Sequence, residues 1–82
     1  MSDATGAHEL DASGLLCPLP VIRTARRVET LAAGETLVVH ASDPGAAHDI
    51  PAWCRVHGHQ VLACDTDAED RVTVRIRVGG SE

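Results

Sequence analysis

Aromatic side chains are nearly absent from this sequence of 82 residues, which has no Phe or Tyr and a single Trp. RNA-binding sheets stack bases on aromatic rings, so this absence makes an RNA-binding module a less favoured reading of Arg71, Arg75 and Arg77. The net charge of −5 with neutral histidines repels polyanions and anionic membranes. We therefore expect neither direct nucleic-acid binding nor membrane binding.

Long hydrophobic runs and paired cysteines are missing as well. No segment approaches the length of a membrane span, and residues 1–8 lack the basic and apolar parts of an export signal. The three cysteines are an odd number and contain no C-x-x-C pair, which favours reduced thiols over a disulfide framework. The expectation is a cytoplasmic protein.

The length and composition predict one small domain. Its core must be built from Val, Ile, Leu and Ala, because large aromatic side chains are lacking. Residues 1–7 mix small and polar side chains without periodicity, which predicts a flexible N-terminal tail before a single domain over residues 8–80.

Hydrophobic periodicity predicts strands that alternate with helices. Strands are expected at residues 8–11, 36–41, 60–65 and 72–78, and helices at 18–33 and 44–57. Gly34 and Gly58 follow the two helices at positions typical of helix-ending glycines. Pro51 should kink the second helix or split it in two, in which case Asp49 would cap the second piece.

The expected architecture is an α+β fold, a two-layer α/β sandwich. The last strand alternates strictly between apolar and polar residues, and each helix has a single apolar stripe. The order βαβαββ then places two helices on one face of a four-stranded mixed sheet, with the other face in solvent. The inward residues are expected to be Val21, Ala25, Val28 and Ala32 in the first helix, and Ala46, Ile50, Trp53 and His57 in the second.

Cys17 stands directly before Pro18 in an otherwise apolar run. Proline fits the first position of a helix, so Cys17 is predicted at the N-cap, where free N–H groups and the helix dipole favour a thiolate at neutral pH. Pro20 would stiffen the first turn, and Gly14 would give the chain the freedom to turn towards Cys17. The alternative is that Cys17 is a small buried hydrophobe.

Several short motifs in this chain resemble those of the TusA/SirA-like sulfur-carrier family. They are Leu10-Asp11-Ala12, Gly14-Leu15, Cys17-Pro18-Leu19-Pro20, Gly34-Glu35, and Asp43-Pro44 followed by Asp49-Ile50-Pro51. The Cys-Pro-x-Pro element is the signature of that family. The resemblance implies a βαβαββ sandwich like the C-terminal domain of translation initiation factor three, with Cys17 as the catalytic residue that carries sulfur as a persulfide. Leu19 departs from the family pattern, in which a polar or acidic residue is common, and an exposed leucine there would favour a more apolar docking partner.

The resemblance also implies sulfurtransferase activity and partner proteins. Sulfane sulfur would come from a cysteine desulfurase, a rhodanese or thiosulfate and pass to an acceptor protein, for tRNA thiolation, cofactor biosynthesis or sulfur-compound metabolism. No cofactor is expected, and the chain is expected to be a monomer. A thiol-based redox sensor is the alternative, because the same reactive thiol would serve both roles.

The other two cysteines lie within a Cys/His cluster formed by Cys54, His57, His59 and Cys64. Its spacing matches no common zinc pattern, so no metal site is predicted. Cys54 and Cys64 are interpreted as packing residues, with a second carrier thiol at Cys54 as the alternative.

A basic stripe on the first helix consists of Arg23, Arg26 and Arg27. Charged residues on a solvated helix face often serve solubility alone. The functional interpretation is a docking surface next to Cys17 for an acidic partner, or an attractive field for anions such as thiosulfate.

Overall fold

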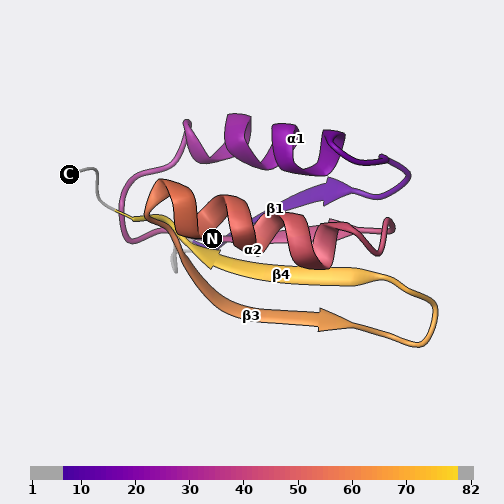
Figure 1. Cartoon of the computed structure of the whole chain (residues 1–82). Helices are drawn as coiled ribbons and strands as arrows, with labels where there is room; N and C mark the ends of the chain where they lie inside the picture. The colour runs from indigo at the N-terminus through magenta and orange to yellow at the C-terminus, as the bar shows by residue number, and fades with distance from the viewer. Residues whose placement is uncertain (1–6, 80–82) are drawn as a thin grey trace.

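The computed structural model describes residues 7–79 of the chain. Its elements are β1 (Ala7–Ala12), α1 (Leu19–Val28), β2 (Thr36–Ala41), α2 (Ala46–His57), β3 (Gln60–Thr66) and β4 (Val72–Arg77). Both helices lie on the same face of the four-stranded sheet (Figure 1). This confirms the predicted βαβαββ sandwich. The predicted tail lies outside the described residues except for Ala7, where β1 begins.

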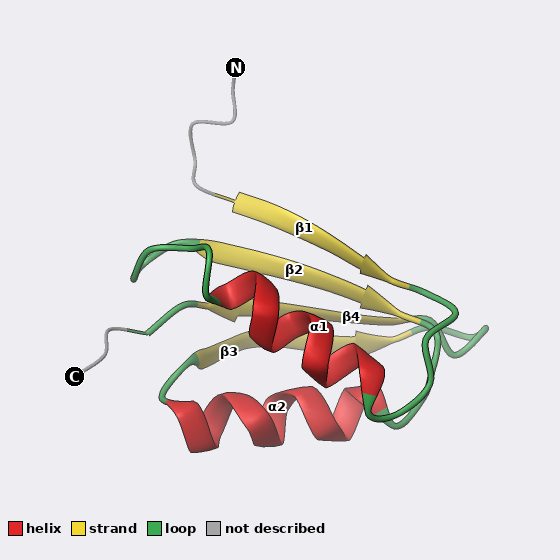
Figure 2. Ribbon diagram, turned by 90° about the horizontal axis from the view of Figure 1, so that it is seen from above, coloured by secondary structure: helices red, strands yellow, loops and turns green. Residues whose placement is uncertain are grey.

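The sheet is mixed and has the strand order β1-β2-β4-β3. β1 pairs in parallel with β2, whereas β4 runs antiparallel to both β2 and β3. Since β1, β2 and β3 point the same way, the loops that follow them gather at one end of the molecule (Figure 2). We call this the Cys17 end, defined by the loops 13–18, 42–45 and 67–71.

The core lies between the sheet and the two helices, and it is aliphatic. The paired central strands β2 and β4 alternate between buried and more exposed residues. Directly opposite each other across this pair lie Leu37 and Ile76, Val39 and Val74, and Ala41 and Val72, all of them buried. The alternation predicted for the last strand is therefore confirmed.

Helix α1 ends at Val28 and not at residue 33 as predicted. Beyond Val28 the N–H groups of Thr30 and Leu31 donate to carbonyls three residues back, which tightens the chain into turns. The Ala32 N–H donates to Glu35 Oε1 at 2.8 Å instead of continuing the helix. Gly34 consequently serves the turn into β2, where its φ of +92° suits glycine, and does not end the helix.

The buried side of α1 is rotated from the predicted stripe. Pro20, Thr24 and Val28 are its buried residues, whereas Val21 and Ala25 are only half-buried. Thr24 is polar and was not expected in the core. Its burial is possible because its hydroxyl donates to the Pro20 carbonyl at 2.8 Å.

Helix α2 runs without a break through Pro51 and ends as predicted at Gly58, which has the left-handed conformation. The predicted split, with Asp49 as a cap, does not occur. The buried residues are Ala46, Ile50 and Cys54, spaced four apart, so Cys54 belongs to the inward face of the helix. Contrary to prediction, His57 is exposed, and Trp53 is half-buried beside the core.

A thiol from β3 compensates in part for the proline in α2. Pro51 has no N–H, so the carbonyl of Ala47, four residues earlier, lacks its usual helical donor. The Cys64 Sγ donates to this carbonyl oxygen at 3.4 Å. The edge strand β3 therefore supplies a donor that the helix itself cannot.

Candidate functional site

The loop between β1 and α1 places Cys17 on the molecular surface and is tied to the loop before α2. Gly14 has a φ of +80°, and its N–H donates to Ser42 Oγ at 2.7 Å. The backbone N–H of Cys17 donates to Asp43 Oδ2 at 2.8 Å. Two segments far apart in the sequence therefore hold the exposed cysteine in place.

The predicted N-cap position of Cys17 is wrong by one residue. Pro18 is the N-cap, α1 begins at Leu19, and Pro20 lies in the first turn. The Leu19 N–H donates to the Leu16 carbonyl at 2.8 Å and therefore does not face the sulfur. Cys17 therefore precedes the N-cap and the first turn of α1.

The thiol of Cys17 faces a carboxylate of α2. Its Sγ lies 3.2 Å from Asp49 Oδ2 and donates to it. This hydrogen bond raises the pKa of the Cys17 thiol, and partial desolvation and the negative charges of Asp49 and Asp43 raise it further. The predicted thiolate at neutral pH is therefore wrong, because the hydrogen bond to Asp49 of α2 favours the protonated sulfur.

Exposed apolar side chains lie near Cys17 in the sequence, just before α1 and in its first residues. Leu16, Leu19 and Ile22 are 70%, 45% and 43% exposed, and we call them the apolar collar. The expected exposure of Leu19 is confirmed.

The other two thiols are less available than Cys17. Cys54 is fully buried, and its burial raises its pKa to about 11. Cys64 lies on the edge strand, donates to the Ala47 carbonyl, and has a pKa raised by desolvation and by Asp65. Both therefore hold their protons firmly in structural positions.

The predicted Cys/His cluster does not come together as a metal site. Trp53 stacks on both His57 and His59, with ring centroids 4.9 and 5.1 Å apart. His59 Nδ1 accepts the Gly79 N–H at 2.9 Å, and burial lowers the pKa of this histidine. Over residues 7–79 no three His, Cys, Asp or Glu side chains are arranged to hold a metal ion, and no pocket is found.

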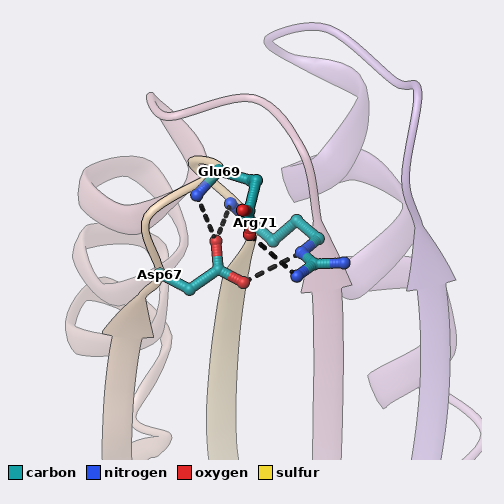
Figure 3. A network of polar contacts seen from close by, with 3 residues as sticks. All are labelled: Asp67, Glu69 and Arg71. Atoms are coloured by element: carbon teal, nitrogen blue, oxygen red, sulfur yellow. Dashed lines mark hydrogen bonds and ion pairs between the residues drawn. The ribbon is translucent and has the colours of Figure 1, made fainter.

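The arginines of the open sheet face do not act as one surface. Arg71 is held in the β3–β4 loop, where its Nε donates to Asp67 Oδ2 at 2.8 Å and its Nη2 to Glu69 Oε1 at 3.0 Å (Figure 3). Arg75 and Arg77 are exposed on β4. The basic platform considered from the sequence is therefore divided between a loop network and one strand.

The basic stripe of α1 only partly adjoins Cys17. Arg23 is the fifth of the ten residues of α1 and so the nearest of the three to Cys17, whereas Arg26 and Arg27 lie in its last turn, towards the opposite end of the molecule. The Cys17 end is instead rich in carboxylates, contributed by Asp11, Asp43, Asp49, Asp65, Asp67, Glu69 and Asp70. The thiol thus lies in an acidic region, which the positions of these residues in the sequence did not reveal.

A second residue of the site, Asp49, belongs to the motif Asp49-Ile50-Pro51. Sequence reasoning used it only to support the resemblance and to suggest a helix cap. The structure places Asp49 in the first turn of α2, directly beside the sulfur. Only packing of α2 next to α1 brings together residues 32 positions apart in the chain.

Helices in the described part of the chain are all too short or too polar to cross a membrane.

Comparison with known proteins identifies the family. Residues 8–78 match the family model described as Sulfurtransferase TusA. The chain is 43% identical over 60 residues, 73% of its length, to a Bacillus subtilis (strain 168) protein with the printed name "Putative sulfur carrier protein YrkF", and it spans 32% of that protein. A SirA-like protein from Desulfitobacterium hafniense has the same fold in its crystal structure, with a TM-score of 0.77, 24% identity and coverage of 89% of this chain and 99% of that one. As the resemblance predicted, the chain belongs to the TusA sulfurtransferase family.

Proposed function

We propose that this chain is a sulfur carrier that holds sulfane sulfur as a persulfide on Cys17 and passes it between two proteins. The family supports sulfur transfer in general terms. The observation that carries the assignment to Cys17 is its exposure at the start of α1, while Cys54 is buried and Cys64 is bonded to the Ala47 carbonyl. Gly14, Pro18, Leu19 and Pro20 would support the presentation of the sulfur.

The proposed step needs little beyond an accessible nucleophile. The Cys17 thiol loses its proton, and its sulfur attacks the outer sulfur of a donor persulfide. A new S–S bond forms on Cys17 while the S–S bond of the donor breaks, and the electron pair of the broken bond stays on the donor sulfur. That sulfur takes up a proton, so Cys17–SH and donor–S–S⁻ give Cys17–S–S⁻ and donor–SH.

The proposed donor is a cysteine desulfurase or a rhodanese, with thiosulfate as a small-molecule source, and the acceptor is a protein thiol. The pathway would be tRNA thiolation, cofactor biosynthesis or sulfur-compound metabolism. The carrier would act as a monomer without a cofactor. Because Cys17 must stay reduced to accept sulfur, we propose a cytoplasmic location.

High-resolution mass spectrometry of the intact protein tests this proposal. The protein is incubated with a cysteine desulfurase plus cysteine, or with thiosulfate, and then mapped by peptide. We expect a single-sulfur adduct on Cys17 that reductant removes. Accurate mass is needed because one sulfur and two oxygens both add about 32 Da.

Two results would count against a carrier. If Cys17 reacts with alkylating agents but gains sulfur from none of these donors, sulfur transfer fails. If it instead gains oxygen on exposure to peroxide, the redox-sensor alternative takes its place.

A further inference from the structure

Asp49 joins the thiol of Cys17 to an imidazole. Its Oδ2 accepts a hydrogen bond from Cys17 Sγ at 3.2 Å, and its Oδ1 lies 3.7 Å from His48 Nδ1. Asp43 adds a second carboxylate, which binds the backbone N–H of Cys17. Asp49 and Asp43, in and just before the first turn of α2, are the titratable groups that act on the thiol, and His48 lies on the solvent side of Asp49.

This arrangement favours the protonated form of the sulfur for two reasons. The hydrogen bond to Asp49 exists only while the sulfur carries its proton, since a thiolate cannot donate. A thiolate would also stand beside a carboxylate of like charge, which disfavours ionisation. Neutralising Asp49 would remove both effects at once.

We propose that Asp49 controls the reactivity of Cys17: its carboxylate keeps the sulfur protonated in the free carrier, and a positive charge brought against it by the docked partner releases the thiolate. Asp49 is thus a positioning and specificity-determining residue for the sulfur transfer. The part concerning a partner rests on the proposed function, whereas control of the thiol is a property of the free chain.

The control by Asp49 has a consequence for specificity. A reactant that carries positive charge next to its sulfur is attracted to the Asp49 carboxylate. That positive charge weakens the effect by which Asp49 keeps the Cys17 thiol protonated. An anionic reactant such as thiosulfate is repelled by the same group. Free Cys17 is also shielded from oxidation, because the thiolate is the form that oxidants attack.

The alkylation rate of Cys17 in the free protein tests the first half of the proposal. Wild type, Asp49→Asn and the matched control Glu29→Gln are treated with iodoacetamide at several pH values, and peptide mapping separates Cys17 from the other thiols. Glu29 is exposed at the far end of α1, so its variant removes the same charge away from the site. We expect Asp49→Asn to react about tenfold faster at neutral pH, equivalent to a thiol pKa about one unit lower, and Asp49→Glu and Glu29→Gln to behave like wild type.

A rate for Asp49→Asn equal to that of wild type would overturn the proposal. A slower rate would overturn it too, because it would mean that Asp49 assists removal of the proton. Circular dichroism of each variant establishes that the fold is retained.

Charge selectivity towards small disulfides tests the second half. The probes are cystamine, which carries two ammonium groups, and dithiodipropionate, which carries two carboxylates. In each reaction the Cys17 sulfur forms a bond to one probe sulfur, the probe S–S bond breaks, and the other half leaves as a thiolate. We expect wild type to prefer cystamine, and this preference to fall several-fold in Asp49→Asn but not in Glu29→Gln.

The same preference can be measured on wild type alone, in case Asp49→Asn does not fold. Added salt screens exposed charges, so the ratio of the two rates should fall as KCl is raised. A ratio that does not change with salt would overturn the proposal. None of these measurements involves sulfur loading, so the failure of the carrier function and the failure of the Asp49 control give different results.

Discussion

The three cysteines differ in burial and in the partner of the thiol, and their chemistry differs accordingly. Cys17 is exposed, and its thiol donates a hydrogen bond to Asp49. Cys54 is fully buried, and Cys64 is held by the Ala47 carbonyl. All three have raised pKa values, so acidity in the free protein does not distinguish them. Burial separates Cys54 from Cys17, and Cys64, although also exposed, differs from Cys17 in donating to a backbone carbonyl of α2.

Single cysteine variants test this difference at the residue scale. Cys17→Ser should form no sulfur adduct, because the hydroxyl oxygen is not a persulfide-forming nucleophile, and its fold should be unchanged since the side chain is exposed. Cys54→Ser and Cys64→Ser should load sulfur to the wild-type extent. Intact mass after incubation with a cysteine desulfurase plus cysteine measures each, and loss of loading in either of the latter would contradict a single-thiol mechanism.

Helix α2 serves both the core and the site. Its inward residues Ala46, Ile50 and Cys54 pack on the sheet, while Asp49 in its first turn reaches the sulfur. Asp49 is also well placed there for the helix itself, because a carboxylate in the first turn interacts favourably with the dipole. The helix passes through Pro51 without a break, with the Cys64 thiol donating to the carbonyl that Pro51 leaves free.

A double-mutant cycle at Pro51 and Cys64 tests this interaction between α2 and β3. Cys64→Ala should lower the free energy of unfolding by about 0.5–1 kcal/mol, because it leaves the Ala47 carbonyl without its donor. In a Pro51→Ala background the restored backbone N–H can serve that carbonyl, so the cost should approach zero. Urea unfolding of the four proteins measures the coupling. Equal costs in both backgrounds would contradict a role for the thiol as substitute donor.

The molecule as a whole is polarised between its two ends. Carboxylates dominate the Cys17 end, whereas Arg26, Arg27, Arg55 and Arg77 lie towards the other end (Figure 2). The core that joins them is small and aliphatic, with the thiol of Cys54 fully enclosed. Both the stability and the docking of the carrier should therefore depend on charge.

Stability should fall in alkaline solution because of Cys54. Its folded pKa of about 11 lies above the ordinary value of a cysteine thiol, so the folded state holds the proton to a higher pH than the unfolded chain does. The stabilisation is complete below the unfolded pKa and is lost as the pH rises through the folded one, to a limit of about 3 kcal/mol. Between about pH 8 and about pH 10.5, the free energy of unfolding measured in urea should decrease less for Cys54→Ala than for wild type. Cys17 and Cys64 are present in both proteins, so equal decreases would contradict this assignment.

The residues of the basic stripe are expected to differ in their contribution to docking. A partner at the Cys17 end would meet Arg23 but not Arg27, which lies in the last turn of α1. If the stripe serves docking, Arg23→Glu should slow sulfur transfer from a protein donor by about threefold or more, and Arg27→Glu should not. Transfer kinetics at low salt measure both. A wild-type rate for Arg23→Glu would leave solubility as the role of the stripe.

Local features of the sequence were sufficient to predict the architecture. The alternation of Val72, Val74 and Ile76 and the β-branched segment 36–41 identified strands, and the predicted bounds of β2 agree with the structure. Gly58 ended α2 as expected. These signals are reliable because they depend on a few adjacent residues and on which face is buried. The end of α1 was not predicted, because the apolar spacing continues to Ala32 whereas the backbone changes to tighter turns after Val28.

The sequence by itself determined the family, the order of elements and the position of Cys17, since all three are properties of residues near one another in the chain. Only the tertiary structure decided the state of that cysteine. A hydrogen bond between Cys17 and Asp49 joins residues 32 positions apart, and it exists because α1 and α2 pack side by side with their first turns at the same end of the sheet. The electrostatic environment of a thiol is set by the groups within a few ångströms of it in space. The periodicity of the sequence does not reveal which residues distant in the chain lie that close.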